Sequence, residues 1–281
     1  MTYGELLALR IDAAFAADVA TREDSLRKHL GASVIGESCQ RKIWFGFRWC
    51  DKEEFDGRML RLFERGQREE LAFKHLLELV GAKVWTLDQY GKQFGISSHG
   101  GHFSGSTDGV AQNLPELGDE PVLLEMKTHN EKRFNELRTK GLQEAQPKHY
   151  KQAQTYMWGL GLKKSLYCAV NKNDDELWFY LFDADPAIGR SLDDKAESII
   201  FGHGLPPRIS NSPATHWECR FCPMRGVCLK DKEVRRNCRT CVHSKPERDG
   251  TWSCARGREE ITTAPKEGCY WYSVIPELAT V

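Results

Sequence analysis

The chain has 281 residues, of which 40% are hydrophobic and 28% are charged. These fractions are ordinary for a soluble globular protein and allow one well-cored domain with an appendage. The formal net charge is zero, so total charge indicates no polyanionic partner. No apolar run approaches the ~20 residues that span a bilayer, and residues 1–20 lack the apolar segment of a signal peptide. We therefore expect a cytoplasmic protein without a membrane partner.

The charge is unevenly distributed. Residues 219–258 hold 11 Lys and Arg against four Asp and Glu, a local charge of +7, while residues 1–218 sum to −4. A basic segment beside an acidic body suits a nucleic-acid path that leads to a carboxylate–metal site. A solvated charged surface explains the same pattern equally well.

Helices and strands are predicted from spacing. Residues 5–30 form an amphipathic helix that ends near Gly31, and Ser33 caps the aromatic segment 33–49. Residues 94–112 and 121–128 form two strands of a hairpin, with a turn over 114–121. A helix follows over 143–160, then strands over 165–171 and 177–182, and a helix over 186–201. Beyond Gly204 the chain is loop-like and rich in cysteine.

A long helix is predicted from Arg58 to Val80. One face carries a three–four spacing of mostly apolar residues, namely Phe63, Gly66, Glu70, Phe73, Leu77 and Val80. Glu70 therefore lies on or beside the buried stripe, an expensive position for a carboxylate without a role. Glu69 could share this position, and periodicity does not separate the two.

Three residues suggest a metal site. Asp108 follows a strand in a segment of small residues, and Glu125 directly follows an apolar run that predicts a central strand. Lys127, two residues later, projects from the same face as Glu125. Carboxylates hold Mg²⁺ or Mn²⁺ for phosphodiester hydrolysis, and a lysine can position or deprotonate water. The alternative, an ion pair on an exposed strand, fits poorly with the apolar run.

Polar residues nearby have weaker signals. Gln152 and Tyr156 share a helix face and could bind a DNA phosphate or orient site groups, although such pairs often lie at a partly exposed helix edge. His99, His102 and His129 flank the predicted site. We expect them to be loop or solvent residues, because Mg²⁺ and Mn²⁺ prefer oxygen ligands.

Ten cysteines in a cytoplasmic protein predict metal ligands where they are closely spaced. Cys50 and Cys168 fit no ligand spacing and are predicted to be buried packing residues. Three thiolates come from one short segment: Cys219, Cys222 and Cys228. Cys39 is the best candidate for a fourth. Such a set can hold an iron–sulfur cluster or zinc.

A second set of four cysteines lies nearer the C-terminus: Cys238, Cys241, Cys254 and Cys269. Their spacing suits tetrahedral zinc. Residues 235–281 hold few apolar side chains, and zinc binding of roughly 10–16 kcal/mol could stabilise such a lobe. The lobe could bind DNA or a partner, or could be a structural cap.

The order of these motifs resembles the RecB-like branch of the PD-(D/E)XK nuclease superfamily. The matching motifs are Gly66-x3-Glu70, Asp108, Glu125-x-Lys127 and Gln152-x3-Tyr156. The resemblance implies metal ligands at Glu70, Asp108 and Glu125, a catalytic lysine at Lys127, and substrate or site support from Gln152 and Tyr156. Thr107 stands at the name-giving proline, and Glu70 stands where CRISPR-adaptation members have histidine.

The same resemblance implies the architecture. We expect an α/β, restriction-endonuclease-like core with a mixed central sheet flanked by helices over residues 1–234. The four cysteines Cys39, Cys219, Cys222 and Cys228 resemble the [4Fe–4S] clasp of the AddAB helicase–nuclease and CRISPR-adaptation nucleases. A zinc-binding lobe over residues 235–281 completes the predicted chain.

The implied activity is an Mg²⁺- or Mn²⁺-dependent DNA exonuclease that acts on single-stranded or resected DNA in recombination, repair or replication. The build is similar to phage or mobile-element nucleases, which work in a bacterial host cytoplasm with a recombinase, helicase or integrase. Two alternatives stay open: a non-catalytic DNA-binding or assembly module, and a DNA-trimming nuclease of CRISPR-adaptation type.

Overall fold

The computed structural model describes residues 1–22, 26–257, 265 and 267–279, so Arg258 of the basic segment lies outside the described residues. The chain forms two compact units. Unit 1 comprises Met1–Ser25, Glu54–Ile96 and Ser106–Gly189, and unit 2 comprises Leu26–Glu53, Ser97–Gly105 and Arg190–Val281. The predicted C-terminal lobe thus groups with residues 26–53 in unit 2, and its division from residues 1–234 stays a prediction.

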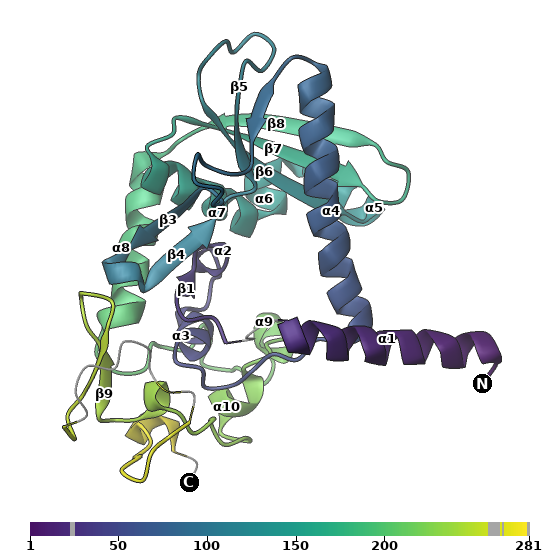
Figure 1. Cartoon of the computed structure of the whole chain (residues 1–281). Helices are drawn as coiled ribbons and strands as arrows, with labels where there is room; N and C mark the ends of the chain where they lie inside the picture. The colour runs from purple at the N-terminus through teal and green to yellow at the C-terminus, as the bar shows by residue number, and fades with distance from the viewer. Residues whose placement is uncertain (23–25, 258–264, 266, 280–281) are drawn as a thin grey trace. The chain divides into compact units, whose positions relative to one another are not determined.

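A five-stranded mixed sheet forms the centre of unit 1, in the order β2-β5-β6-β7-β8 (Figure 1). The strands are β2 (Lys83–Trp85), β5 (Gly109–Gln112), β6 (Val122–His129), β7 (Lys164–Asn171) and β8 (Leu177–Asp183). Among these five strands, only β6 and β7 run parallel to each other. Three helices make the crossover that a parallel pair requires: α5 (Glu131–Lys140), α6 (Leu142–Ala145) and α7 (Pro147–Leu160).

The strand register separates the two faces of this sheet. Glu125 lies opposite Tyr167, which lies opposite Tyr180, and Lys127 lies opposite Ala169, which lies opposite Trp178. Directly paired residues share a face, and we call this face the Glu125 face. Tyr150 of α7 packs on it against Phe182.

The opposite face of the sheet is apolar and packs against α4 (Gly57–Leu79). The residues in this core are Phe73, Leu77, Ala82, Val84, Ala111, Leu114, Val122, Leu124, Met126, Cys168 and Val170. Helices therefore flank both faces, which confirms the predicted mixed sheet flanked by helices.

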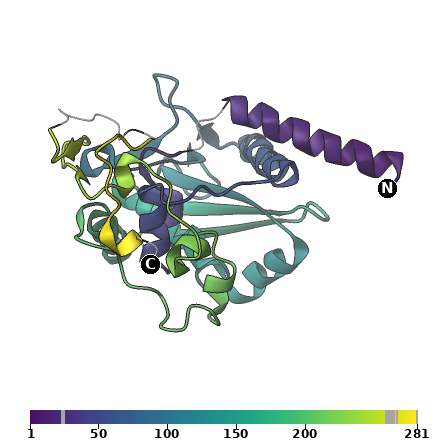
Figure 2. The same ribbon diagram turned by 90° about the horizontal axis from the view of Figure 1, so that it is seen from below.

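The helix α4 confirms the prediction for Arg58–Val80 to within one residue at each end. Asp56 caps it by accepting a hydrogen bond from the Met59 backbone N–H at 2.7 Å. Within the predicted stripe only Phe73 and Leu77 are buried, since Phe63 is 44% exposed and Val80 is 58% exposed. Helix α1 (Tyr3–Arg22) meets the first turns of α4 (Figures 1 and 2), where Arg61 pairs with Asp12 at 2.8 Å.

Two predictions near the N-terminus are wrong. Leu30–Gly31 forms strand β1 in unit 2, where Leu30 is buried and pairs with Phe103 of β4 (Phe103–Ser106). No helix therefore continues to residue 30. Ser33 is no cap either, because it lies inside α2 (Ala32–Ile35), which begins after Gly31.

The predicted strand over residues 94–112 is interrupted. It consists of β3 (Gly95–Ser98), the 3-10 helix η1 (His99–Gly101), β4 and β5. Gly100 has φ of +69°, and a Cβ there would lie 2.4 Å from the Gly250 backbone nitrogen. A glycine is needed at this close approach, and its turn breaks the strand.

The predicted helix over 143–160 is also divided, because Pro147 lacks an N–H and starts α7 at its first position. The later predictions are confirmed: β7 and β8 match the two predicted strands within a residue or two, and α8 (Pro186–Phe201) matches its range. No helix in the described part of the chain is long and apolar enough to cross a membrane.

Unit 2 builds its C-terminal segment onto α3 (Gln40–Phe47). The remaining elements are α9 (Trp217–Arg220), α10 (Arg225–Leu229), η2 (Cys238–Thr240), β9 (Ser244–Pro246), β10 (Trp252–Cys254) and η3 (Pro276–Leu278). The buried guanidinium of Arg239 lies 3.8 Å from the Trp49 ring centroid and donates to the Phe47 carbonyl at 2.8 Å. Trp252 packs beside Phe47. The segment therefore shares a core with α3.

Candidate active site

Three predicted site residues come together in unit 1. The Lys127 ammonium nitrogen lies 2.6 Å from Glu125 Oε1 and 3.1 Å from Asp108 Oδ2. The backbone N–H of Met126 also donates to Asp108 Oδ2 at 2.7 Å. Both carboxylates therefore converge on one positive charge.

A glycine fixes the position of Asp108. Gly109, the first residue of β5, has φ of +158°, and a Cβ there would lie 2.9 Å from the Trp85 carbonyl oxygen. A larger residue would strain the backbone or push β2 away. Asp108 is thereby held at the start of β5, within hydrogen-bond reach of the β6 backbone.

Glu125 lies in an unusual environment for a carboxylate. Its side chain is 0% exposed, the Lys127 ammonium 2.6 Å from Oε1 is its charge partner, and Oε2 has no hydrogen-bond partner among the described groups. Burial raises its pKa to about 7, against the lowering effect of Lys127. A buried carboxylate with an unsatisfied oxygen is costly, and a bound cation would satisfy it.

Glu70 faces the same group of charges from α4. Its pKa is raised to about 7, first by burial and then by the charge of Asp108, while Lys127 lowers it. Glu69 points elsewhere, with Oε1 3.9 Å from Arg65 Nε. Glu70 therefore feels the charges of the site, whereas Glu69 pairs with Arg65, and a metal-binding role for Glu70 stays a prediction.

Lys127 is held in its charged form. Burial lowers its pKa, but Glu125 and Asp108 raise it by more, so that the net direction is upward. As long as both carboxylates carry their charges without another cation, Lys127 keeps its proton. Neutralising these carboxylates would lower its pKa toward the range in which it can accept a proton.

The donor set fits a divalent cation, with the Lys127 ammonium as the stand-in. No three His, Cys, Asp or Glu side chains among the described residues are grouped as ligands of one metal ion, and Lys127 takes the space between Asp108 and Glu125. Hard carboxylate oxygens are the ligands that Mg²⁺ and Mn²⁺ prefer. Asp108 and Glu125, with Glu70 beside them, would hold the ion.

Gln152 and Tyr156 lie on α7, which packs against β6 and β7. Both side chains are buried, so the alternative of a partly exposed helix edge is wrong. Their position on the helix of the Glu125 face is compatible with support of the site, and that role stays a prediction.

His102 lies in a turn as expected, although it is buried, whereas His129 is neither a loop nor a solvent residue. His129 is buried as the last residue of β6, and His102 is buried with a ring nitrogen 2.9 Å from the Glu247 carbonyl oxygen. His99 Nε2 lies 3.0 Å from Asp193. The alternation from Glu125 and Lys127 to His129 could have placed His129 on the site face.

Sequence reasoning missed a hydrogen-bonded cluster beside the site. The Tyr167 hydroxyl lies 2.9 Å from His129 Nε2 and 2.7 Å from His149 Nδ1. Tyr167 is the register partner of Glu125. The cluster therefore forms part of the wall of the site.

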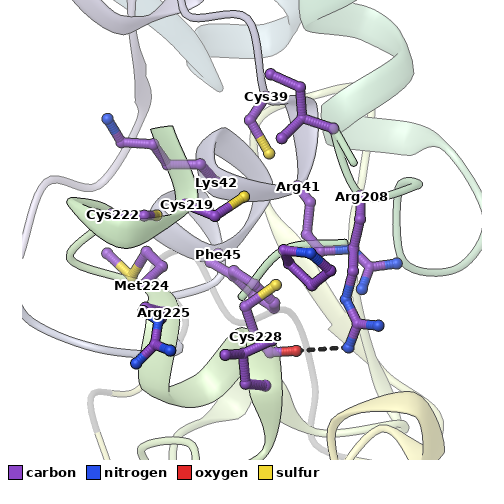
Figure 3. Close-up of a pocket in the computed structure, with 13 residues that line it drawn as sticks. Cys39, Arg41, Lys42, Phe45, Arg208, Cys219, Cys222, Met224, Arg225 and Cys228 are labelled. Atoms are coloured by element: carbon purple, nitrogen blue, oxygen red, sulfur yellow. Dashed lines mark hydrogen bonds between the residues drawn. The ribbon is translucent and has the colours of Figure 1, made fainter. Parts of the chain in front are cut away.

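The first cysteine set lines one pocket of unit 2 (Figure 3). Cys39 is the residue before α3, and the other three come from α9, α10 and the segment between them. Burial and the charges of Cys39 and Cys228 raise the pKa of Cys219 and of Cys222. The structure thus brings the four predicted thiols together.

A [4Fe–4S] cluster at this set stays a prediction. Each thiolate of a [4Fe–4S] cluster binds a different iron, so the thiols should surround a space without converging on one point. Cations also line the pocket and would offset the negative charge of a thiolate-bound cluster: Arg41, Lys42, Arg208 and Arg225. Arg208 donates to the Cys228 carbonyl at 2.8 Å, which joins the two sides of the pocket (Figure 3).

Zinc binding by the second cysteine set stays a prediction. Cys238 and Cys241 are buried and Cys254 and Cys269 are half-buried. Tetrahedral zinc requires all four thiolates on one ion, and no such group occurs among the described residues. Cys50 and Cys168, in contrast, are fully buried as predicted.

No protein-family model and no curated protein matches the chain. Among solved structures, an alkaline exonuclease (LHK-Exo) from Laribacter hongkongensis is 18% identical, with a TM-score of 0.44 over 66% of this chain and 88% of that chain. The structure of LHK-Exo in complex with dAMP is also 18% identical, with a TM-score of 0.45 over 66% of this chain and 88% of that chain. SSO0001 is 16% identical, with a TM-score of 0.43 over 81% and 96%. Similarities at these TM-scores establish neither fold nor activity for this chain.

Proposed function

We propose that the protein is an Mg²⁺- or Mn²⁺-dependent deoxyribonuclease with a RecB-like, PD-(D/E)XK site, acting as an exonuclease on single-stranded or resected DNA. One observation supports this most strongly. Asp108 and the buried Glu125 converge on one cation, at 3.1 and 2.6 Å from Lys127 Nζ. An acidic pair with one member fully buried has no packing purpose and is the arrangement that metal-assisted hydrolysis needs.

Each residue has a distinct part in the proposed reaction. Asp108, Glu125 and Glu70 would hold the metal ion. When bound, the ion would polarise the scissile phosphate and make a water molecule more acidic. Lys127 Nζ lies between the two carboxylates, where its ammonium form would orient the water. Once a bound cation offsets the carboxylates, its neutral form would accept the water's proton. Gln152 and Tyr156 support this arrangement from α7.

The iron–sulfur clasp is part of the proposal. The pocket formed by Cys39 and the three later cysteines supports it, together with the cations that line this pocket. The zinc lobe stays a prediction from spacing, and no catalytic step depends on it. Action in a bacterial host cytoplasm with a recombinase, helicase or integrase rests on motif resemblance alone.

A Lys127→Met variant tests the proposed role of the lysine. Cleavage of end-labelled DNA in Mn²⁺ should fall by at least about a hundredfold, as expected for loss of a proton-transferring group, while Mn²⁺ binding is retained or tightened. Lys140→Met, at an exposed position on α5, is the matched control and should cleave normally. Normal turnover by Lys127→Met would contradict the proposed site.

The non-catalytic DNA-binding module makes a different prediction. It would bind DNA and leave it intact in every metal, and its acidic residues could be replaced without consequence. The unsatisfied Oε2 of Glu125 argues against it, because a binding module gains nothing from burying this oxygen.

A further inference from the structure

Three aromatic rings stack along β8 on the Glu125 face. The Trp178 and Tyr180 ring centroids lie 5.6 Å apart with planes 2° apart, and Tyr180 and Phe182 lie 5.8 Å apart with planes 20° apart. Alternate residues of a strand share a face, so the rings follow the strand. We call Trp178, Tyr180 and Phe182 the β8 ladder.

The ladder is anchored at one end and open at the other. Phe182 is buried against Tyr150 of α7, at 5.2 Å between centroids. Tyr180 is 37% exposed, and Trp178 is half-buried. Packing against α7 explains Phe182, but it does not explain two further aromatic rings held parallel at the surface of an edge strand.

The open end of the ladder continues into the candidate active site. The Trp178 ring meets the Tyr167 ring edge-on, at 6.3 Å between centroids and 70° between planes. Tyr167 is in turn the register partner of Glu125. The exposed rings and the acidic residues therefore lie on one face of the sheet, with a single ring between them.

Positive charge accompanies this face. His129 and His149 hold the Tyr167 hydroxyl, and burial is the main cause of the lowered pKa of both. Arg133 and Lys127 lower it further, and Lys172 also acts on His129. Single-stranded nucleic acid requires cations for its phosphates and aromatic rings for its bases. The ladder offers the rings, and Arg133 and Lys172 are the cations that act on the histidines beside Tyr167.

We propose that Trp178 and Tyr180 form a stacking platform for unpaired bases of the DNA strand that enters the site. This rests on the proposed nuclease function and narrows its substrate to single-stranded DNA or frayed ends. Bases inside a duplex are stacked on each other and cannot lie on the rings. The rings are already parallel and held by Phe182, so little side-chain freedom is lost on binding.

Binding without metal tests the proposal separately from cleavage. The probe is a fluorescein-labelled oligothymidylate of about 20 nucleotides, titrated in EDTA and read by anisotropy. Tyr180→Ala and Trp178→Ala should each weaken binding about tenfold. Phe179→Ala is the control, because Phe179 is 41% exposed on the same strand but on the opposite face. It should bind as the wild type does.

A second probe separates stacking from folding. An abasic strand of equal length keeps the phosphates and lacks the bases. Wild type should bind it more weakly than oligothymidylate, and Tyr180→Ala should lose nothing further on it. Tyr180→Phe and Trp178→Phe should restore binding of the base-bearing strand, since a phenyl ring still stacks.

Three results would overturn the stacking platform: no measurable binding of oligothymidylate by wild type, equal binding by the alanine variants, or an equal loss on the abasic strand. The outcome is distinguishable from failure of the nuclease proposal. If binding depends on the β8 ladder but no metal-dependent cleavage occurs, the nuclease proposal is refuted and the proposal of a DNA-binding surface is retained. If wild type cleaves DNA but binding does not depend on the β8 ladder, the nuclease proposal is retained and the stacking platform is refuted.

Discussion

Replacing Glu125 by glutamine should stabilise the metal-free protein at neutral and alkaline pH. In the folded protein the pKa of Glu125 is raised from 4.5 to about 7, because the carboxylate is buried. The folded state therefore binds the Glu125 proton more tightly than the unfolded chain does. Glutamine resembles the protonated carboxyl group at every pH.

The sign and size follow from proton linkage. A raised pKa contributes stability that is fully present below pH 4.5 and is lost as the pH rises to about 7. A tenfold change in proton affinity is worth about 1.4 kcal/mol, so the complete loss is about 3 kcal/mol. The Lys127 ion pair is already included, since its charge lowers this same pKa.

Urea unfolding in EDTA at pH 5, 6, 7 and 8 measures this difference. Wild type and Glu125→Gln should be nearly equal at pH 5, and the variant should be more stable by about 3 kcal/mol at pH 8. Adding Mn²⁺ should reverse the order, because a ligand of the folded state stabilises only the protein that binds it. Glu144→Gln, at an exposed position, should match wild type throughout.

A variant that is less stable than wild type at pH 8 in EDTA would refute the reasoning. It would mean that the charged form of Glu125 is well satisfied by protein groups alone. The carboxylate would then be a structural partner of Lys127, and its burial would no longer support a role as a metal ligand.

Two further changes test the turn before β5 and the cysteine pocket of unit 2. Gly109→Ala should cost about 1–3 kcal/mol of stability and reduce cleavage, because a Cβ would lie 2.9 Å from the Trp85 carbonyl oxygen; normal stability in thermal unfolding would show that the turn before β5 tolerates a side chain. Cys222→Ser should remove the brown colour and visible absorption of anaerobically purified protein; a colourless wild type without iron would contradict the cluster.

The spacing of the chain predicted the part of the site that is local in sequence. Glu125 and Lys127 lie two apart on a central strand, so strand geometry alone places them on one face. The apolar run before Glu125 correctly indicated burial. Asp108 required only the hairpin partner of that strand.

Contacts between distant segments could not be predicted. Tyr167 meets His149 because α7 crosses over between the parallel strands β6 and β7, and spacing contains no information on that crossover. Glu70 and Glu69 were inseparable by periodicity, since they differ in the charge of Asp108 acting on Glu70 and in the ion pair of Glu69 with Arg65.

The failed helix boundary has a similar cause. Residues 23–30 contain no glycine or proline that would end a helix, yet Leu30 belongs to strand β1 because its partner is Phe103, far along the chain. Where a breaker was present, as at Gly100, the signal was local and could have been read from the sequence.

The most direct test of the account compares wild type and Glu125→Ala, both purified anaerobically. Each is incubated with end-labelled single- and double-stranded DNA in Mn²⁺, Mg²⁺ or EDTA. Wild type should shorten the DNA progressively, only when metal is present, and faster on single strands than on double strands. Glu125→Ala should leave the DNA intact. Intact DNA in every lane, or equal cleavage by Glu125→Ala, would contradict the account.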